Sequence, residues 1–249
     1  MTSPPPAAAD RSTPPPRVLI ATFAFNEGAK IRTTVERIVA ATAHDVVVMN
    51  DGSTDGSMAE LRAFPVRILS NDRNDGIGAA MKRAFDHALE NGYEALVIMA
   101  GNNKDDPSEI PRLLQPIVDD NCDFVQGSRF LQGGGHGNMP LYRRLATRLH
   151  PLLFSLATGR WLTESTNGFR AFRTALLRDP RIDWKQEWLN QYELEPYLLY
   201  KVITLGYKHT EVPVTKIYPK SQSYTKMRAF TGWWSILRPL VYLRLGLKK

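Results

Sequence analysis

The sequence predicts an α/β fold in which a mostly parallel sheet lies between two layers of helices. From Val18 onward, short apolar runs alternate with amphipathic stretches. The apolar runs lack polar interruptions, which is typical of strands covered on both faces. The amphipathic stretches carry apolar residues at helical spacing, as Ile31, Val35 and Ile38 do. Alternating strands and helices favour a parallel sheet, whose ligands bind at the carboxyl ends of the strands.

The first half of the chain is expected to supply five strands with helices between them. The expected strands are 18–25, 46–49, 66–69, 95–99 and 124–126. The expected helices are 29–42, 57–64, 78–90 and 107–118. Pro107 stands at the first turn of its helix, where a missing N–H costs nothing. Each of these runs is short enough to belong to one compact sheet.

The pattern changes after the glycines at 133–137. We expect an Arg-rich helix, a short strand, a long helix and a late strand, at 141–156, 169–172, 188–205 and 211–217. The last stretch, 230–247, is aromatic and aliphatic with interspersed arginines. No internal repeat is evident.

Composition narrows the function classes. The 249 residues suit one large α/β domain or two small ones, and the single cysteine, Cys122, excludes an internal disulfide and fits a reducing compartment. The net charge of +7 favours nucleic acid, an anionic membrane or phosphorylated small molecules. We expect no nucleic-acid partner, because zinc-finger cysteines and a base-reading basic helix are absent from the sequence.

The two ends of the chain differ from its middle. Residues 1–17 hold two Pro-Pro-Pro runs and no apolar core of a signal peptide, so we expect a disordered arm. Residues 18–226 form the expected catalytic domain, and 227–249 form an amphipathic segment. No apolar run approaches the ~18–20 residues that span a bilayer. We therefore expect a cytoplasmic protein, free or at the cytoplasmic face of a membrane.

Two strand ends predict a nucleotide pocket. Asp51 follows the second strand and leads into a Gly-Ser-Thr-Asp-Gly-Ser turn, while the first strand ends in Phe25-Asn26-Glu27-Gly28. Such a turn holds a base or ribose, or it is only a tight turn with a helix cap. Two of them side by side favour the pocket. Phe25 or Phe23 could stack on the base, although Phe23 fits the core equally well.

A glycine pair marks a third candidate contact. Gly76 and Gly78 precede the helix 78–90 and permit a close approach of the backbone to a phosphate at a helix N-terminus. A Gly-x-Gly turn is common, so this signal is weak without the others.

The ordered set of these motifs resembles family 2 glycosyltransferases. Phe25-Asn26-Glu27 is followed by Asp-Gly-Ser-Thr-Asp-Gly-Ser at 51–57 and Asn-Asp-Gly-Ile-Gly-Ala-Ala at 74–80. Gly-Ser-Arg-Phe at 127–130, Thr-Asn-Gly-Phe-Arg-Ala-Phe at 166–172, Gly206-Tyr207 and Glu-Val-Pro-Val at 211–214 resemble the branch with dolichyl-phosphate mannose synthase and bacterial polyprenyl-phosphate sugar transferases. The resemblance covers about 18–227 and implies the GT-A fold, a Rossmann-like three-layer αβα arrangement.

The resemblance also implies roles for particular residues. Phe25, in place of the usual Tyr, and Glu27 stand where the family contacts the nucleotide, and Asp51 stands where it contacts the base. Arg129 stands where a donor or acceptor phosphate is held. Further candidates are Glu164, before the Thr-Asn-Gly-Phe-Arg run, and the phosphate-binding Lys220 and Lys226.

The metal motif departs from the family pattern. Members carry Asp-x-Asp-x-Gln after the fourth strand, whose oxygens bind a divalent ion on the diphosphate. Here those positions are Ala100, Asn102 and Lys104. Asn102 remains a donor contact, but Mg²⁺ or Mn²⁺ prefers charged oxygens. Either Asp105 or Asp106 supplies a ligand from a shifted backbone, or Lys104 replaces the metal as the catalytic positive charge. The run Asp105-Asp106-Pro107 is also typical of a helix cap.

The expected reaction is inverting transfer from a nucleoside diphosphate sugar. Glu164 is the candidate general base, with an ion pair to Arg143 or Arg170 as the alternative.

Arg129, Lys220 and Lys226 favour a lipid phosphate acceptor, unless they are solvated surface charges. The segment 227–249 suits a membrane surface or packs on the domain. Alternatives are a transferase with a soluble or glycan acceptor and a degenerate nucleotide-sugar-binding protein. A nucleotidyltransferase is disfavoured, because no Gly-rich basic loop follows the first strand.

Overall fold

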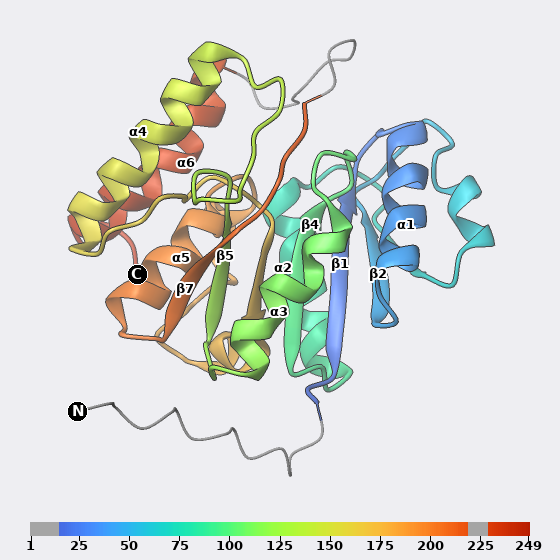
Figure 1. Ribbon diagram of the computed structural model, residues 1–249, viewed down its shortest axis with the longest axis horizontal. Helices are drawn as coiled ribbons and strands as arrows, with labels where there is room; N and C mark the ends of the chain where they lie inside the picture. The colour runs from blue at the N-terminus through green and yellow to red at the C-terminus, as the bar shows by residue number, and fades with distance from the viewer. Residues whose placement is uncertain (1–14, 219–228) are drawn as a thin grey trace, which may run out of the picture.

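A seven-stranded sheet forms the centre of the protein. The computed structural model describes residues 15–218 and 229–249 (Figure 1). The strands are β1 (Val18–Ala24), β2 (Asp45–Asn50), β3 (Arg67–Ser70), β4 (Ala95–Ala100), β5 (Phe124–Ser128), β6 (Arg170–Arg173) and β7 (His209–Pro213). Their order across the sheet is β3-β2-β1-β4-β6-β5-β7. The predicted mostly parallel sheet is confirmed, and β6 runs antiparallel to both its neighbours, β4 and β5.

Helices cover both faces of this sheet. They are α1 (Ala29–Ala41), α2 (Ile77–Glu90), α3 (Ile110–Val118), α4 (Leu141–Thr158), α5 (Leu194–Thr204) and α6 (Ala229–Arg244). Alternate residues of β1 point to opposite layers: Leu19 and Ala21 join the cluster under α2 and α5, whereas Val18 and Ile20 join the cluster under α3. Figure 1 shows α2 and α3 on opposite faces, so the predicted α/β three-layer fold is confirmed.

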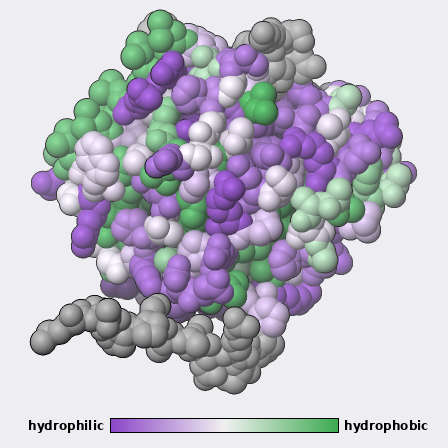
Figure 2. Space-filling view, in the orientation of Figure 1, coloured by the Kyte–Doolittle hydropathy of each residue, from purple (hydrophilic) through white to green (hydrophobic). Residues whose placement is uncertain are grey.

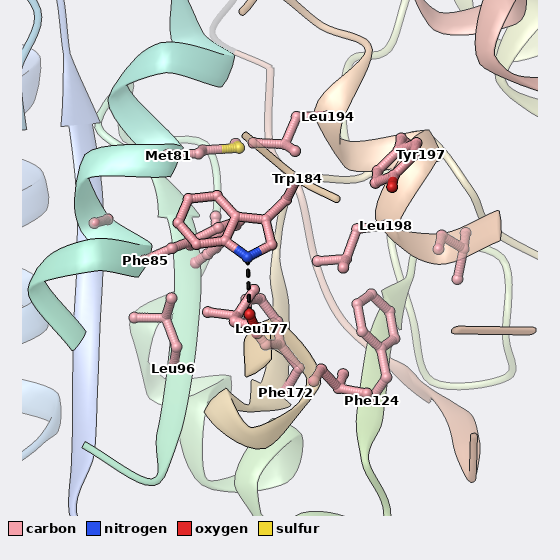
Figure 3. Packing of buried hydrophobic residues seen from close by; sticks show 14 of the residues in the cluster. Met81, Phe85, Leu96, Phe124, Phe172, Leu177, Trp184, Leu194, Tyr197 and Leu198 are labelled. Atoms are coloured by element: carbon pink, nitrogen blue, oxygen red, sulfur yellow. Dashed lines mark hydrogen bonds between the residues drawn. The ribbon is translucent and has the colours of Figure 1, made fainter. Parts of the chain in front are cut away.

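An aromatic cluster anchors the long connection between β6 and α5. The Trp184 ring lies edge-on to Phe85 of α2, with ring centroids 5.4 Å apart, and its indole Nε1 donates to the carbonyl of Leu177 at 2.9 Å (Figure 3). From α2, Nζ of Lys82 donates to the carbonyl of Gln186 and to Oδ1 of Asn190, both at 2.6 Å. The segment that follows is thereby fixed over the N-terminus of α2.

Three of the expected elements differ most in extent. The expected helix 57–64 is only a 3₁₀ helix, Ala59–Ala63. The expected helix 188–205 begins at Leu194, because the preceding backbone turns away to contact α2, where Asn190 accepts from the amide of Ala79. The expected strand 211–217 pairs over His209–Pro213, and its last residues form only isolated bridges to the loops at Gly135 and Asp105.

The expected N-terminal arm and the expected absence of a membrane span can be compared with the structure only within the described residues. Most of the expected disordered arm, 1–17, lies outside the described residues. Within the described ranges, every helix is too short or too polar to cross a bilayer.

Candidate active site

The carboxyl ends of β1, β2 and β4 open into one cavity of about 1140 Å³. The predicted donor-site side chains Phe23, Phe25 and Glu27 of the β1 end, Asp51 of the β2 end, and Asn102 and Lys104 of the β4 end all line it. The two turns that the sequence placed side by side are hydrogen-bonded together: the Asn26 amide donates to Oγ of Ser53 at 3.0 Å, and the Thr54 amide donates to Oδ1 of Asn26 at 2.8 Å. The strand ends therefore converge as expected.

Asp51 is held rigidly at the cavity wall. Its side chain is buried, and Oδ2 accepts from the amide of Gly76 at 2.9 Å. Oδ1 accepts from the Asp75 amide and from Nη2 of Arg83, both at 3.3 Å. These contacts fix the carboxylate in one orientation.

Gly76 and Gly78 pack closely against the backbone of residues 189–191. Gly76 lines the cavity at φ 106°, but its N–H is taken by Asp51, and a Cβ there would lie 2.5 Å from the carbonyl oxygen of Asn190. Gly78 is absent from the cavity lining, and a Cβ would lie 2.0 Å from the carbonyl oxygen of Leu189. The expected phosphate contact is therefore corrected for Gly78: it lets the chain before α5 cross α2.

Arg129 occupies the end of the cavity towards β5. It is buried, and three of its five N–H donors reach described side chains: Nε donates to Oε2 of Glu164 at 2.7 Å, Nη1 to the Tyr218 hydroxyl at 3.0 Å, and Nη2 to Oγ1 of Thr166 at 2.7 Å. Burial alone would lower the pKa of Arg129, but attraction and hydrogen bonding to Glu164 raise it above its ordinary value. Arg129 is thus a fixed cation on the cavity wall.

Glu164 lies beneath the cavity, outside its lining. The side chain is fully buried, and Oε1 accepts from the amides of Ser165, Thr166 and Asn167 at 3.0, 2.8 and 3.2 Å. Burial favours a higher pKa for this carboxyl, but the Arg129 charge and these hydrogen bonds lower its pKa. The geometry does not support the expected general base: the ion-pair partner of Glu164 is Arg129, neither Arg143 nor Arg170, and the carboxylate does not line the cavity.

A group of cations surrounds Tyr218. Nζ of Lys104 and Cζ of Arg143 lie 5.3 and 5.6 Å from the centre of its ring. Burial first, and then the charges of Lys216 and Arg143, lower the pKa of Lys104 to about 8, with Glu27 acting in the opposite direction. The cations Lys104, Arg129, Arg143 and Lys216 line this side of the cavity, whereas the carboxylates paired with two of them, Glu164 and Asp105, lie outside the lining, so this side presents positive charge to an anion.

The side chains around Asn102 do not fit a divalent ion. Asp105 is buried away from the cavity: Oδ1 accepts from Nζ of Lys216 at 2.6 Å and Oδ2 from the Ala100 amide at 3.2 Å. Oδ1 of Asn102 is buried without a hydrogen-bond partner among the described residues, so it can meet a ligand, but one neutral oxygen is a weak anchor for Mg²⁺. No cluster of three or more metal-ligating side chains occurs within 15–218 or 231–249.

Lys216 and Tyr218 are two of the cavity residues that the sequence did not predict. Both follow β7 and line the cavity with Lys104 and Arg129. Side chains of an extended chain alternate between its two sides, so residues 214, 216 and 218 lie on one side, and Val214 is buried there. This spacing of two residues is the sequence signal that could have identified Lys216 and Tyr218. The predicted phosphate ligands Lys220 and Lys226 lie outside the described residues.

Helices α4 and α6 form the remaining wall. Arg143 and Thr147 of α4, and residues 231–236 and Arg238 of α6, line the cavity. Arg238 binds Oε1 of Glu193 through Nη2 at 2.6 Å, and the His150 ring lies between Ser165 Oγ at 2.7 Å and the Ile236 carbonyl at 3.0 Å. Much of the expected amphipathic segment 227–249 therefore packs on the domain as a cavity wall.

Comparison with known proteins agrees with this geometry. The model of the family described as Glycosyl transferase family 2 matches residues 19–180. Undecaprenyl-phosphate mannosyltransferase of Micrococcus luteus is 32% identical over 80% of this chain and 83% of its own length. Polyprenol monophosphomannose synthase of Mycolicibacterium smegmatis is 31% identical over 81% of this chain and 78% of its own.

Solved structures support the same fold. Glucosyl-3-phosphoglycerate synthase from Mycobacterium tuberculosis, in complex with Mn²⁺, UDP-glucose and phosphoglyceric acid, superposes with a TM-score of 0.69 at 17% identity. The match covers 94% of this chain and 81% of that one, and it shows the GT-A fold. With the family match over most of the domain, and with Glu27, Asp51 and Asn102 in one cavity, this chain belongs to glycosyl transferase family 2 and is a glycosyltransferase.

Proposed function

We propose that this enzyme transfers a sugar from a nucleoside diphosphate sugar to a polyprenyl-type lipid phosphate, with inversion at the anomeric carbon. The observation that carries the proposal is one cavity with two chemically different ends. Asp51 and Glu27 line the end at β1 and β2, whereas Arg129 and Arg143 line the end at β5 and α4. The first end suits a nucleoside and the second an anionic acceptor.

The absence of a suitably placed base supports a phosphate acceptor. Four described carboxylates line the cavity: Glu27 lies at the nucleoside end, where its charge acts on Lys104, Asp51 is hydrogen-bonded to Gly76, Glu193 is paired with Arg238, and Glu195 with Arg170. An alcohol would need a base at hydrogen-bond distance, whereas a phosphate is already ionised near neutral pH. Its oxygen attacks the anomeric carbon, and the bond from that carbon to the diphosphate breaks with the electron pair leaving on the nucleoside diphosphate.

We also propose that side-chain cations take over the charge compensation for which related enzymes use a metal. Lys104 occupies the last position of the altered motif and lines the cavity near Lys216 and Arg143. Fixed positive charges at a developing diphosphate stabilise the transition state without a metal. The expected result is activity retained in excess chelator. Complete loss in chelator, restored by Mg²⁺ or Mn²⁺, contradicts this part of the proposal.

The place of action follows from the acceptor. A lipid phosphate is presented at a membrane surface, and the buried Cys122 needs no oxidising compartment. We therefore place the enzyme in the cytoplasm, at the cytoplasmic face of a membrane.

The test is a transfer assay with three acceptors. The purified chain is incubated with a panel of uridine and guanosine diphosphate sugars and with a polyprenyl phosphate, the matching unphosphorylated polyprenol, or a soluble glycan. Label is expected in the lipid extract only with the phosphate. Transfer to the polyprenol or the glycan contradicts the acceptor class. Nucleotide binding without transfer or hydrolysis indicates a degenerate enzyme.

A further inference from the structure

Helix α4 exposes an unusual amount of apolar surface. Figure 2 shows apolar surface at the upper left of the molecule, where Figure 1 places α4. Seven large apolar side chains of this helix are exposed, each by 39% or more: Leu141, Tyr142, Leu145, Leu149, Leu152, Leu153 and Leu156. Exposed apolar residues are common singly, but a contiguous group marks an interaction surface.

These seven side chains lie on one side of the helix. With about 100° of rotation per residue, their positions fall within an arc of roughly 120°. The opposite side of α4 is buried: Thr147, His150 and Phe154 face the domain. The inner face of the helix is therefore used for packing within the protein, whereas its apolar stripe points outward and is left uncovered by the described residues.

Positive charge borders the exposed stripe. Arg144 and Arg148 are exposed, and the same helical geometry places both beside one edge of the apolar arc. No Asp or Glu occurs from Phe130 to Thr163, and the exposed Arg160 and Trp161 follow the helix. An apolar face with arginines on its border and an indole at its end matches the lipid–water interface, where cations meet anionic headgroups.

We propose that the outward face of α4 docks on an anionic lipid bilayer, with the helix lying in the plane of the interface. The occupant is inferred from charge complementarity. A two-fold contact between copies brings the same surface of both copies together, so the arginine border of one copy would lie against that of the other. The segment 130–163 holds no acidic residue that could neutralise these arginines. An anionic membrane covers the apolar stripe with its acyl chains and binds the arginine border through its anionic headgroups.

Docking through α4 has a consequence for the reaction, which rests on the proposed function. The inner face of the same helix carries Arg143 and Thr147 into the catalytic cavity. One helix therefore separates the bilayer from the cavity, and the acceptor phosphate needs to move only across the width of a helix, ~10 Å, to reach Arg143. The exposed leucines set the depth of the cavity mouth relative to the headgroups.

The experiment is vesicle co-flotation of the full chain. Vesicles of phosphatidylcholine, with or without phosphatidylglycerol, are mixed with the wild type and with a Leu145→Glu/Leu149→Glu/Leu156→Glu variant. The matched control is Val118→Glu, since Val118 is an aliphatic residue of α3 that is 47% exposed. An Arg144→Gln/Arg148→Gln variant tests the charge separately. Far-ultraviolet circular dichroism and thermal unfolding verify that each variant is folded.

The wild type and the Val118 control are expected to float with the anionic vesicles. The triple variant should lose at least about tenfold in partition coefficient, because three exposed leucines that the bilayer would cover become charges. The arginine variant should lose its preference for phosphatidylglycerol. Flotation of the triple variant at the wild-type level overturns the inference. Failure of the wild type to float, with dimers that the triple variant abolishes, also overturns it and assigns the face to a second copy.

Failure of this inference is distinguishable from failure of the proposed function. A short-chain, water-soluble polyprenyl phosphate removes the need for docking, so the triple variant should transfer sugar to it at the wild-type rate and lose activity only with acceptor in vesicles. Equal activity of both proteins on vesicle-bound acceptor contradicts docking and leaves the function standing. Flotation without transfer to either acceptor supports docking and contradicts the function.

Discussion

Replacing Glu164 with Gln separates two roles for this residue. The carboxylate is fully buried, with Oε2 on Nε of Arg129 at 2.7 Å and Oε1 on three backbone amides. A Gln side chain has one oxygen for these two sets of donors. In one orientation its NH₂ group faces the N–H of Arg129, and in the other it faces the amides. In either orientation two buried N–H groups face each other without an acceptor, and the charge of Arg129 has no counter-charge.

The structure sets the size of the effect. Breaking a buried ion pair by removing one charge costs about 3–5 kcal/mol. For a domain of this size each kcal/mol shifts the melting temperature by about 2–4 °C, so the variant should melt roughly 6–20 °C lower. Glu60→Gln is the control: Glu60 pairs with Arg32 at 3.8 Å on the surface, and its loss should cost less than about 1 kcal/mol.

Urea unfolding and steady-state kinetics provide the assay. If Glu164 positions Arg129, stability falls and KM for the phosphate acceptor rises. A double variant, Glu164→Gln/Arg129→Met, should recover part of the stability, because no unpaired charge stays buried. Unchanged stability together with a collapse of kcat alone would refute the positioning role and restore Glu164 as a general base.

Three further predictions concern the cavity and its walls. Lys104→Ala should lower kcat by about 10²–10³ without changing the melting temperature, and Asn102→Asp/Lys104→Gln should make turnover depend on Mn²⁺; a wild-type rate in the first variant is the contrary result. Gly78→Ala should destabilise the protein by at least about 1–3 kcal/mol in urea unfolding, because its Cβ would lie 2.0 Å from the carbonyl oxygen of Leu189. Burial lowers the pKa of His150, against the opposing effects of the Ile236 carbonyl and Glu164, so the native state keeps this ring neutral. Its stabilising effect is complete above the unfolded pKa of about 6.5 and is lost as pH falls below it, so His150→Asn should lose less stability than the wild type between neutral and acidic pH.

The donor end of the cavity could be predicted from the sequence because its signals are local. Phe25-Asn26-Glu27 and Asp51-Gly52 each follow an apolar run, and parallel strands bring their carboxyl ends to one edge. In the structure Glu27, Asp51 and Asn102 line one cavity, as this convergence of strand ends predicts. A local sequence pattern was therefore enough to predict a cavity residue where that residue directly follows a strand.

The partners of buried groups could not be predicted in this way. Glu164 and Arg129 are 35 residues apart, and several arginines were equally plausible partners until the chain path was known. Gly78 resembled a phosphate-binding glycine, because nothing near it in the sequence shows that the backbone at Leu189 crosses α2. Contacts that depend on the return of a distant segment leave no periodic signal.

The surface of the helical wall shows the same limit. The sequence predicts an Arg-rich helix at 141–156, and for 227–249 it leaves open a membrane surface or packing on the domain. In the structure α6 buries Ser235, Pro239 and Leu240 within the protein, whereas α4 exposes its leucines. Composition shows that a helix has an apolar face, but the neighbouring elements decide whether that face is covered.

The most direct test of the account is a crystal structure of the chain with a bound nucleoside diphosphate, grown in chelator. The base is expected beside Asp51 and the diphosphate against Lys104, in the cavity shared with Arg129. A nucleotide bound at another surface, or a diphosphate that orders only after Mn²⁺ is added, would contradict it.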